Sequence, residues 1–477
     1  IISLAILGIG LGAALAAWRA RWRDVALIPS FLALSGLLVL ILLLVAVWAG
    51  PYDLYGGVLV LVPLPYVFVG LALATFFSTA PEESPRLYRA DLLGAGAGVL
   101  LSVPLLNWLG GLNGALFATL IFGLAALVIT RAELRPAVVL TVVTFIVLLS
   151  NLWVGWLDVD MGQLSTQKPI TESLSQGGRL IASHWDAFAR TDLVDPGNGK
   201  PYELYIDGAA GSVMPPADDK TLLRSDIGFF PFATNRPARV MVIGPGGGLD
   251  VWFALNSQTQ EMAAVEINPA SVALVNQFAA YHGDLYQQPG VRIVVDEGRS
   301  VLRREAQLYD LIYLSQVVTL AAERSGYALT ENTIYTLEAF KEYLAHLRPG
   351  GQVALKLYDE LTLTRALVTA VTAVAQMQNV TEAEAIRHVA VFLDPDADPP
   401  VPLLIVQREP FVREDGLAYA GVAAQVGFVP LFVPEVAGSP ALEAVLSGSG
   451  SLADIVAASP SDISVTTDDR PFFYQFE

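Results

Sequence analysis

Four glycines and one glutamate have the types and the spacing that suit nucleotide binding. The glycines follow an apolar run at 239–243 and are Gly244, Gly246, Gly247 and Gly248. A second apolar run ends at Glu266. Glycines allow sharp backbone turns and the close approach of a ligand. A carboxylate roughly 20 residues beyond such a turn can accept hydrogen bonds from two ribose hydroxyls.

The spacing of the glycines separates two classes of cofactor. A dinucleotide fingerprint, GxGxxG, would place its third glycine at Leu249, whereas this chain has GxGxG at Gly244, Gly246 and Gly248. The pattern therefore favours an adenosyl ligand over NAD. The alternative is an α/β turn whose glycines serve packing alone.

The surrounding segment is expected to alternate strands and helices. Strands are predicted at 239–243, 262–267, 291–295, 309–315, 351–358, 386–393 and 402–407, and a helix at 361–378. This alternation is typical of a parallel sheet covered by helices on both faces. We predict a Rossmann-like α/β domain with a seven-stranded, mostly parallel sheet over 236–477, after a linker and small β module over 158–235.

Residues 1–157 have a different composition from the rest of the chain. They contain 7 Arg, no Lys and 6 acidic residues, whereas the remainder has 21 basic and 40 acidic residues. Apolar runs lie at 1–18, 25–49, 57–77, 92–109, 114–130 and 137–156. Most approach the ~20 residues that span the hydrocarbon core of a bilayer. We predict a multi-pass helical membrane domain of about six spans over 1–157, and a further span could precede Ile1.

The arginines of the first part predict an orientation in the inner cell membrane. They fall in alternate loops: Arg19, Arg21 and Arg23, then Arg86 and Arg89, then Arg131 and Arg135. The positive-inside rule places these loops in the cytoplasm. Six spans would then put 158–477 on the non-cytoplasmic face. A cytosolic cofactor does not reach that face. Either one span is miscounted, or the domain does not use a cytosolic cofactor.

Several other functions are disfavoured by composition. No ionisable residue lies in the middle of an apolar run, which argues against a transporter and for anchoring. The chain has no cysteine, and its four histidines lack ligand spacing, so no metal site is expected. The acidity of 158–477 argues against nucleic acid as a partner. The small residues at 94–98, GAGAG, predict close contact between helices.

Several motifs in order resemble one known family. They are YELYIDG, IGPGGGLDV, VEINP, DEGRSVLRR, YDLIYLS, YALTENTIYTLEAFKEYLAHLRPGG and TDDRPFF. The chain resembles, over essentially its whole length, the membrane-fused branch of the spermidine synthase (polyamine aminopropyltransferase) family. This resemblance implies a class I adenosylmethionine-dependent transferase fold. It implies transfer of an aminopropyl or methyl group from S-adenosylmethionine or its decarboxylated form to an unknown acceptor, such as an amine.

The resemblance also implies roles for individual residues. In the family, the glycine turn passes the sugar and amino-acid tail of the donor, and the acid at the position of Glu266 holds the ribose. An acid after the third strand contacts adenine, and alignment places Glu297 there, beside Asp296 and Gly298. Either acid could accept from the adenine amino group; the alternative is a solvated turn. The family often dimerises through this domain, so the expected partners are a second copy or another membrane protein.

One position departs from the family pattern. Ser315 stands where aminopropyltransferases have the Asp that deprotonates the attacking amine, and no carboxylate follows at 316–318. Serine without a partner base has no useful basicity near neutral pH. Glu323 or Glu331, further along the chain, could supply the lost acidity. The alternative to a transferase is a catalytically inactive binding or structural membrane protein that kept the spermidine synthase-like fold.

Overall fold

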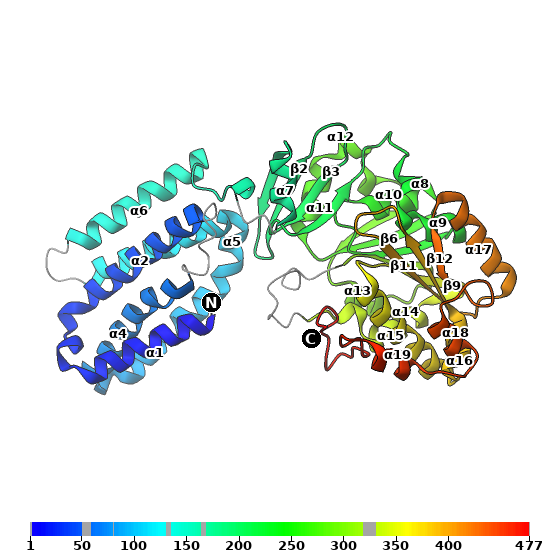
Figure 1. Ribbon diagram of the computed structural model, residues 1–477. Helices are drawn as coiled ribbons and strands as arrows, with labels where there is room; N and C mark the ends of the chain where they lie inside the picture. Colours follow the sequence, from blue (N-terminus) through cyan, green and yellow to red (C-terminus); the bar gives the residue numbers. More distant parts are fainter. Residues whose placement is uncertain are drawn as a thin grey trace. The chain divides into compact units, whose positions relative to one another are not determined.

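The structure, a computed structural model, describes residues 2–49, 59–79, 81–129, 135–163, 168–317 and 331–476. It divides the chain into two compact units, Ile1–Asp192 and Leu193–Glu477 (Figure 1). We call the first the helical unit and the second the α/β unit. The division falls within the small β module expected from the sequence.

The helical unit contains apolar helices of membrane-spanning length. Its helices are α1 (Ile2–Trp18), α2 (Ile28–Ala49), α4 (Pro63–Thr79), α5 (Ser84–Ile129), α6 (Arg135–Val154) and the short α7 (Pro169–Ser175). Four stretches among the described residues, Val25–Trp48, Leu59–Thr79, Pro81–Ile129 and Arg135–Val154, are long and apolar enough to cross a bilayer, and α1 is a shorter apolar helix. These helices indicate a membrane protein.

The six expected apolar runs correspond to five helices because two of them share α5. This helix bends at Gly110, whose φ of 73° and ψ of 177° interrupt the helical backbone. Glycine adopts such a positive φ without the steric penalty of a side chain. The runs at 92–109 and 114–130 therefore form two arms of one element.

Close helix packing involves other glycines than those predicted. A Cβ added to Gly12 of α1 would lie 2.1 Å from the Val67 carbonyl oxygen, and one added to Gly70 of α4 would lie 2.2 Å from that of Ile9. Only glycine allows α1 and α4 to approach this closely. The contact predicted at 94–98 is not formed, since no described atom lies within 4 Å of a Cβ added to Gly94, Gly96 or Gly98. The prediction of a helix contact at 94–98 is therefore not met within the described part of the chain, where these glycines are exposed.

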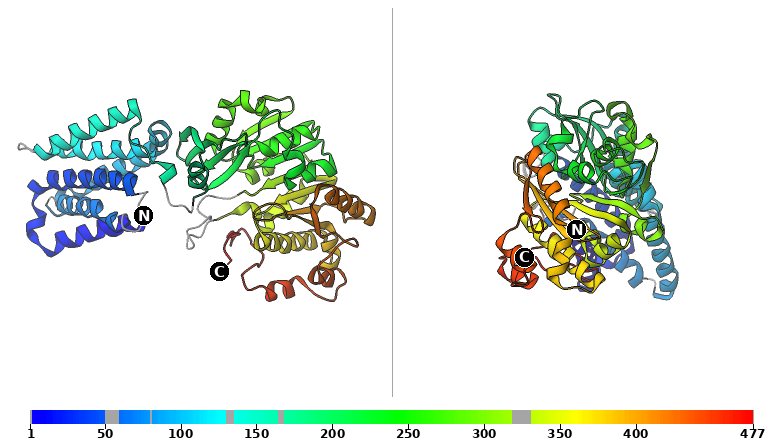
Figure 2. Two further views of the ribbon diagram at one scale, coloured as in Figure 1. Left: turned by 45° about the horizontal axis from the view of Figure 1, so that its top comes forward. Right: turned by 90° about the vertical axis from the view of Figure 1, so that its right-hand side faces the viewer.

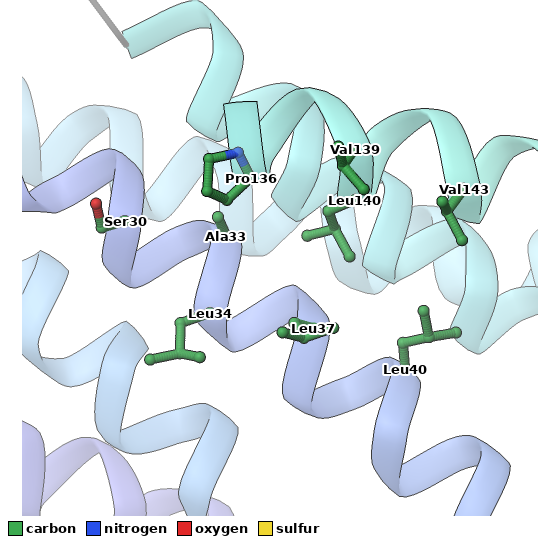
Figure 3. Close-up of a pocket in the computed structure, with 9 residues that line it drawn as sticks. All are labelled: Ser30, Ala33, Leu34, Leu37, Leu40, Pro136, Val139, Leu140 and Val143. Atoms are coloured by element: carbon green, nitrogen blue, oxygen red, sulfur yellow. The ribbon is translucent and has the colours of Figure 1, made fainter. Parts of the chain in front are cut away.

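Between α2 and α6 lies an apolar groove of about 460 Å³ (Figure 3). Leu34 and Leu37 of α2 and Val139 and Val143 of α6 line it. Ser30 is the polar side chain among the lining residues, so the groove offers little to orient a ligand.

Four short strands follow the helices. They are β1 (Arg179–Trp185), β2 (Arg190–Asp195), β3 (Tyr202–Ile206) and β4 (Ala210–Met214), and they form a small sheet in chain order. Strands β3 and β4 form an antiparallel hairpin in which Leu204 is opposite Ser212. This hairpin becomes important below because Ser212 contacts the glycine turn.

The α/β unit is built on an eight-stranded sheet of order β12-β10-β11-β9-β8-β5-β6-β7. Its strands are β5 (Arg239–Ile243), β6 (Glu261–Glu266), β7 (Val291–Val295), β8 (Tyr309–Ser315), β9 (Leu347–Lys356), β10 (Val389–Asp394), β11 (Val401–Gln407) and β12 (Val429–Phe432). The five strands from β9 to β7 are parallel, and β11, β10 and β12 continue antiparallel. The prediction of seven strands is short by one: β12, at the edge, contains Pro430, which makes a strand hard to recognise.

Helices cover both faces of this sheet. They are α8 (Leu222–Ser225), α9 (Phe230–Asn235), α10 (Leu249–Asn256), α11 (Pro269–Gln277), α12 (Ala279–His282), α13 (Gly298–Arg304), α14 (Leu337–Ala345), α15 (Glu360–Gln378), α16 (Glu382–Ala385), α17 (Arg413–Val426), α18 (Pro440–Leu446) and α19 (Leu452–Ala458). The core on one face joins Ile243 and Leu355 to α13, α14 and α15. On the other face, the rings of Phe232 and Tyr313 lie 5.0 Å apart. Figure 2 shows these layers, with green helices on one side of the sheet and yellow helices on the other.

Candidate functional site

The predicted glycine turn connects β5 to α10 at the carboxyl edge of the sheet. The φ angles of Gly244, Gly246 and Gly248 are 73°, 52° and 95°, in the region that L-residues with side chains rarely adopt. Gly248 is the residue from which α10 begins. The turn therefore has the strand, turn and helix order that the sequence predicted.

Atoms of the protein itself crowd three of these glycines. A Cβ at Gly247 would lie 2.5 Å from the Val213 carbonyl oxygen, and one at Gly246 would lie 2.3 Å from Ser212 Oγ. The Gly247 N–H donates to Ser212 Oγ over 2.8 Å. At Gly244 the neighbour would be the Val317 side chain, 3.0 Å away. Packing against β4 and the end of β8 is thus enough to require glycine, and the argument for a ligand rests on other residues.

Glu266, the last residue of β6, is buried and fixed by the backbone. Its Oε2 accepts from the Gly246 N–H over 2.9 Å, and its Oε1 accepts from the Asn268 N–H over 2.9 Å. Burial raises the pKa of this carboxyl, while the backbone hydrogen bonds oppose the rise. A carboxylate has about four lone-pair sites, and the Ile267 N–H is a third backbone donor to this carboxyl. The remaining site can accept from a hydroxyl such as that of ribose.

The two acids after β7 differ in what they bind. Glu297 caps α13, and its carboxylate accepts from the N–H groups of Arg299 and Ser300 over 2.8 and 2.7 Å. Asp296 accepts from the Glu297 N–H over 2.8 Å and forms an ion pair with Arg304. The hydrogen bond from Arg304 lowers the pKa of Asp296. Capping therefore occupies Glu297, and Asp296 is the acid whose partner, a half-exposed arginine, could be exchanged for a ligand.

Gly298 starts α13 against β5. A Cβ added there would lie 2.6 Å from Ile243 Cγ2, so glycine lets the helix begin close to the strand. The Asp296 N–H donates to the Glu266 carbonyl oxygen over 3.1 Å, and the Gly244 N–H donates to that of Val265 over 2.9 Å. The structure thus gathers the predicted donor-binding residues at the ends of three adjacent parallel strands, β5, β6 and β7.

Ser315 ends β8 at the same edge of the sheet. It is opposite Lys356 in the parallel pairing with β9, and the Gln316 N–H donates to the Lys356 carbonyl oxygen over 2.8 Å. Val317 then packs beside Gly244. Glu331 is exposed. Residues 318–330, which include Glu323, lie outside the described residues.

Three charged residues that the sequence did not single out lie by the ends of β8 and β9. The Lys356 ammonium binds both oxygens of Asp226 over 2.7 and 2.8 Å. Asp250, in the first turn of α10, is 5% exposed. Burial raises its pKa to about 8, with nearby Lys356 opposing the rise and Asp226 adding to it. Asp226 and Lys356 are 130 residues apart, so only the fold reveals them, whereas an acid two positions beyond the last glycine was visible in the sequence.

The C-terminal segment fixes the elements behind this edge. Asp468 binds the buried Arg299 guanidinium over 2.7 Å, and Glu342 of α14 binds the same group over 2.9 Å. The Tyr474 hydroxyl donates to the Val317 carbonyl oxygen over 3.1 Å. The motif TDDRPFF therefore joins α13 and α14 through Asp468, and the next residue, Tyr474, binds the segment that follows β8. Among the described residues, no group of three or more His, Cys, Asp or Glu could hold a metal ion.

The structure thus combines an apolar helical unit with an α/β unit whose glycine turn lies beside the buried Glu266 carboxyl. No protein-family model matches the chain. The curated proteins that are similar to it in sequence include three polyamine aminopropyltransferases. Polyamine aminopropyltransferase 2 of Pseudomonas aeruginosa is 27% identical over 157 residues, which are 32% of this chain and 42% of the relative. Polyamine aminopropyltransferase of Corynebacterium efficiens is 26% identical over 280 residues, which are 57% of this chain and 50% of the relative.

Polyamine aminopropyltransferase 2 of Hyperthermus butylicus is 29% identical over 119 residues, or 24% of this chain and 37% of the relative. The matches thus span half or less of the length of these relatives. The C-terminal half of the chain is a distant homologue of polyamine aminopropyltransferases.

Solved structures are similar at lower identity. Spermidine synthase from Thermotoga maritima is 15% identical with a TM-score of 0.35, over 50% of this chain and 75% of that one. A probable spermidine synthase from Corynebacterium glutamicum ATCC 13032 is 18% identical with a TM-score of 0.36, over 51% of this chain and 86% of that one. A spermidine synthase in complex with the transition-state analogue AdoDATO is 15% identical with a TM-score of 0.37, over 50% of this chain and 76% of that one.

Proposed function

We propose that the α/β unit transfers an aminopropyl or methyl group from an adenosylmethionine-type donor to an acceptor amine. The donor is S-adenosylmethionine or its decarboxylated form. The helical unit anchors the protein in a lipid bilayer. The distant homology to polyamine aminopropyltransferases supports a transferase, and the donor-side geometry supports an adenosyl ligand.

The observation that carries the proposal is the position of Glu266. Its carboxylate is held by the Gly246 and Asn268 N–H groups and keeps a lone-pair site for a ribose hydroxyl. Asp296 follows the neighbouring strand, where an adenine amino group would find an acceptor. A nucleoside bound in this way would place its 5′ substituent over the glycine turn.

The reaction requires one proton transfer and one displacement. An ammonium acceptor loses a proton to a base, and its nitrogen lone pair attacks the carbon attached to the donor sulfonium. A carbon–nitrogen bond forms, the carbon–sulfur bond breaks, and the sulfur leaves as a neutral thioether. Ser315 cannot take the proton without a partner base. Two acids lie by this end of the sheet: Asp226, which is paired with Lys356, and Asp250, whose pKa burial raises to about 8, so that it is largely protonated at neutral pH.

Calorimetric titration of the detergent-purified chain tests the donor site. The ligands are S-adenosylmethionine, its decarboxylated form and methylthioadenosine, each titrated into the wild type and Glu266→Ala. We expect micromolar binding of at least one ligand and a loss of about hundredfold in the variant, since a hydrogen bond to a buried carboxylate disappears. Glu261→Ala is the matched control, because Glu261 opens the same strand and pairs with Arg239 at the opposite edge.

Binding that survives Glu266→Ala would contradict the proposed ribose contact. Failure of the wild type to bind any of the three ligands would sink the transferase proposal. Thermal unfolding of the variant separates loss of the contact from loss of the fold, since Glu266 also satisfies two backbone N–H groups.

A second candidate function is a binding or structural membrane protein without catalysis. Ser315 favours it, because the position lacks the family's carboxylate and Gln316 and Val317 supply none. Donor binding without thioether release, tested against a panel of mono- and diamines, would support this candidate over the transferase.

The orientation in the membrane is a separate proposal. The arginine loops predict that 158–477 lies on the non-cytoplasmic face of the inner membrane. Because the chain has no cysteine, single cysteines introduced at Glu414 and Arg86 can be labelled without background. We expect a membrane-impermeant maleimide to label the first in intact cells and the second only after lysis. The reverse pattern would place the α/β unit in the cytoplasm.

A further inference from the structure

The α/β unit contains a cavity of about 580 Å³ that is lined by none of the residues of the glycine turn. It lies between α15, α18 and α19 and the strands β10, β11 and β12, helices that Figure 1 groups beside this part of the sheet. Cavities of this volume are typical of small-molecule sites. The proposed function does not use it.

The body of the cavity is apolar. Leu363 and Leu367 of α15 face Val391 and Leu393 of β10, and Leu442 of α18 closes another side. Leu363, Leu367 and Val391 are nearly inaccessible, so the wall is the core of the unit itself. Such a wall favours an aliphatic group over a polar one, because burying polar atoms without partners is costly.

The polar residues of the cavity include two carboxylates where β9 leads into α15. Tyr358, Asp359 and Glu360 follow the last residue of β9, and both acids are exposed. Asp359 caps α15 by accepting from the Thr362 N–H over 2.8 Å. No Lys, Arg or His is among the residues that line the cavity, all of which lie in the described part of the chain. The cavity therefore attracts a cation and repels an anion of similar shape.

We propose that this cavity binds an amphipathic amine, with the alkyl chain between α15 and β10 and the ammonium at Asp359 and Glu360. The acidity of the surroundings agrees with this ligand, since residues 158–477 carry 40 acidic and 21 basic residues. Carboxylates at the rim exclude a fatty acid of the same length, whose head would meet like charge. None of the predicted donor-binding residues lines the cavity, so this proposal can be tested separately from donor binding.

Ligand-observed nuclear magnetic resonance on the full-length chain in detergent tests this site. The probes are butyl-, hexyl- and octylamine, with octanoate as the anionic counterpart. We expect saturable binding of one equivalent that tightens about fourfold with each methylene. Octanoate should bind at least about tenfold more weakly than octylamine, because like charge meets the rim.

Two variants separate the site from partition into micelles. Ala441→Trp, at an exposed position of α18 that lines the cavity, fills its mouth and should abolish octylamine binding. Asp359→Asn with Glu360→Gln keeps an oxygen for the helix cap and should weaken octylamine binding about tenfold. The matched control is Glu414→Gln with Asp415→Asn, which removes two exposed acids from the first turn of α17 and should change nothing.

Any of three results would overturn the proposal. They are octylamine binding that survives Ala441→Trp, octanoate binding as tight as that of octylamine, and absence of saturable binding in the wild type. Glu266→Ala completes the design, because it should leave amine binding intact. Loss of amine binding in that variant, with the fold retained, would assign the amine to the glycine-turn edge instead.

Discussion

The two ends of the sheet's carboxyl edge differ in how their charged groups are held. At β5, β6 and β7, the Glu266 carboxylate is bound by main-chain N–H groups. At β8 and β9, the neutral Ser315 is opposite Lys356, whose ammonium is bound by Asp226. At the first end the carboxylate is bound by backbone groups, whereas at the other end an ammonium and a carboxylate bind each other.

The proposed transfer accounts for this difference, because the two substrates of such a reaction are recognised differently. A nucleoside offers a rigid diol and a flat ring, so its site needs acceptors fixed in position by the backbone. An amine acceptor offers a charge, so its site needs an unpaired carboxylate. Under the proposed function, the end at β5, β6 and β7 would bind the donor and could keep its geometry while the end at β8 and β9 changes. The glycine turn and Glu266 do not identify the acceptor, because function is determined by the site rather than the fold.

The largest effect that distinguishes the two ends is expected at Asp250. Its carboxyl has a pKa of about 8 in the folded protein and 3.8 when unfolded, chiefly because of burial. Between these pH values the folded state holds a proton that the unfolded state has lost. The free energy of unfolding therefore falls by about 1.4 kcal/mol per pH unit as the pH rises from about 4 to 8. Asp250→Asn cannot ionise and removes this contribution.

The measurement is the free energy of unfolding of the α/β unit in urea at pH 5, 6, 7 and 8. The unfolded fraction is detected by its cleavage with a protease. The variant should gain stability relative to the wild type at each step to higher pH. Glu414→Gln removes an exposed acid, and its unfolding free energy should change with pH as that of the wild type does. Equal slopes for Asp250→Asn and the wild type would mean that Asp250 is ionised in the fold.

A smaller effect tests the packing of the glycine turn. Gly247→Ala places a Cβ 2.5 Å from the Val213 carbonyl oxygen, so β4 or the turn must move. We expect a loss of about 1–3 kcal/mol in unfolding free energy. Gly421→Ala is the matched control, because Gly421 is exposed in α17 with no atom within 4 Å of an added Cβ. There alanine should stabilise by about 0.5–1 kcal/mol through helix propensity.

If Gly247→Ala is as stable as the wild type, the hairpin β3–β4 can shift to make room for the Cβ at little cost in free energy. The close approach of Val213 would then not be what requires glycine at this position. Donor affinity measured on the same variant shows whether the turn binds a ligand in addition to β4.

The sequence predicts the sheet well because buried parallel strands read as apolar runs bounded by turns. The predicted strand at 309–315 coincides with β8, whereas β12 was missed because Pro430 interrupts four residues. The sequence alone does not predict contacts between distant segments, such as the hydrogen bond between Ser212 and the glycine turn, 35 residues apart. The cap formed by Glu297 is local, but glutamate is not a favoured N-cap residue, so the pattern did not indicate it.

The smallest effect is expected at Ser315. Its hydroxyl is not basic, and its partner across the strands, Lys356, is a cation that cannot take its proton. Ser315→Ala should therefore change the donor dissociation constant by no more than about twofold, measured by the calorimetric titration that detects Glu266→Ala. Ser315→Asp restores a carboxylate and should increase the affinity of a diamine such as 1,4-diaminobutane. A large loss of donor affinity in Ser315→Ala would mean that the end of β8 belongs to the donor site, and the distinction between the two ends would fail.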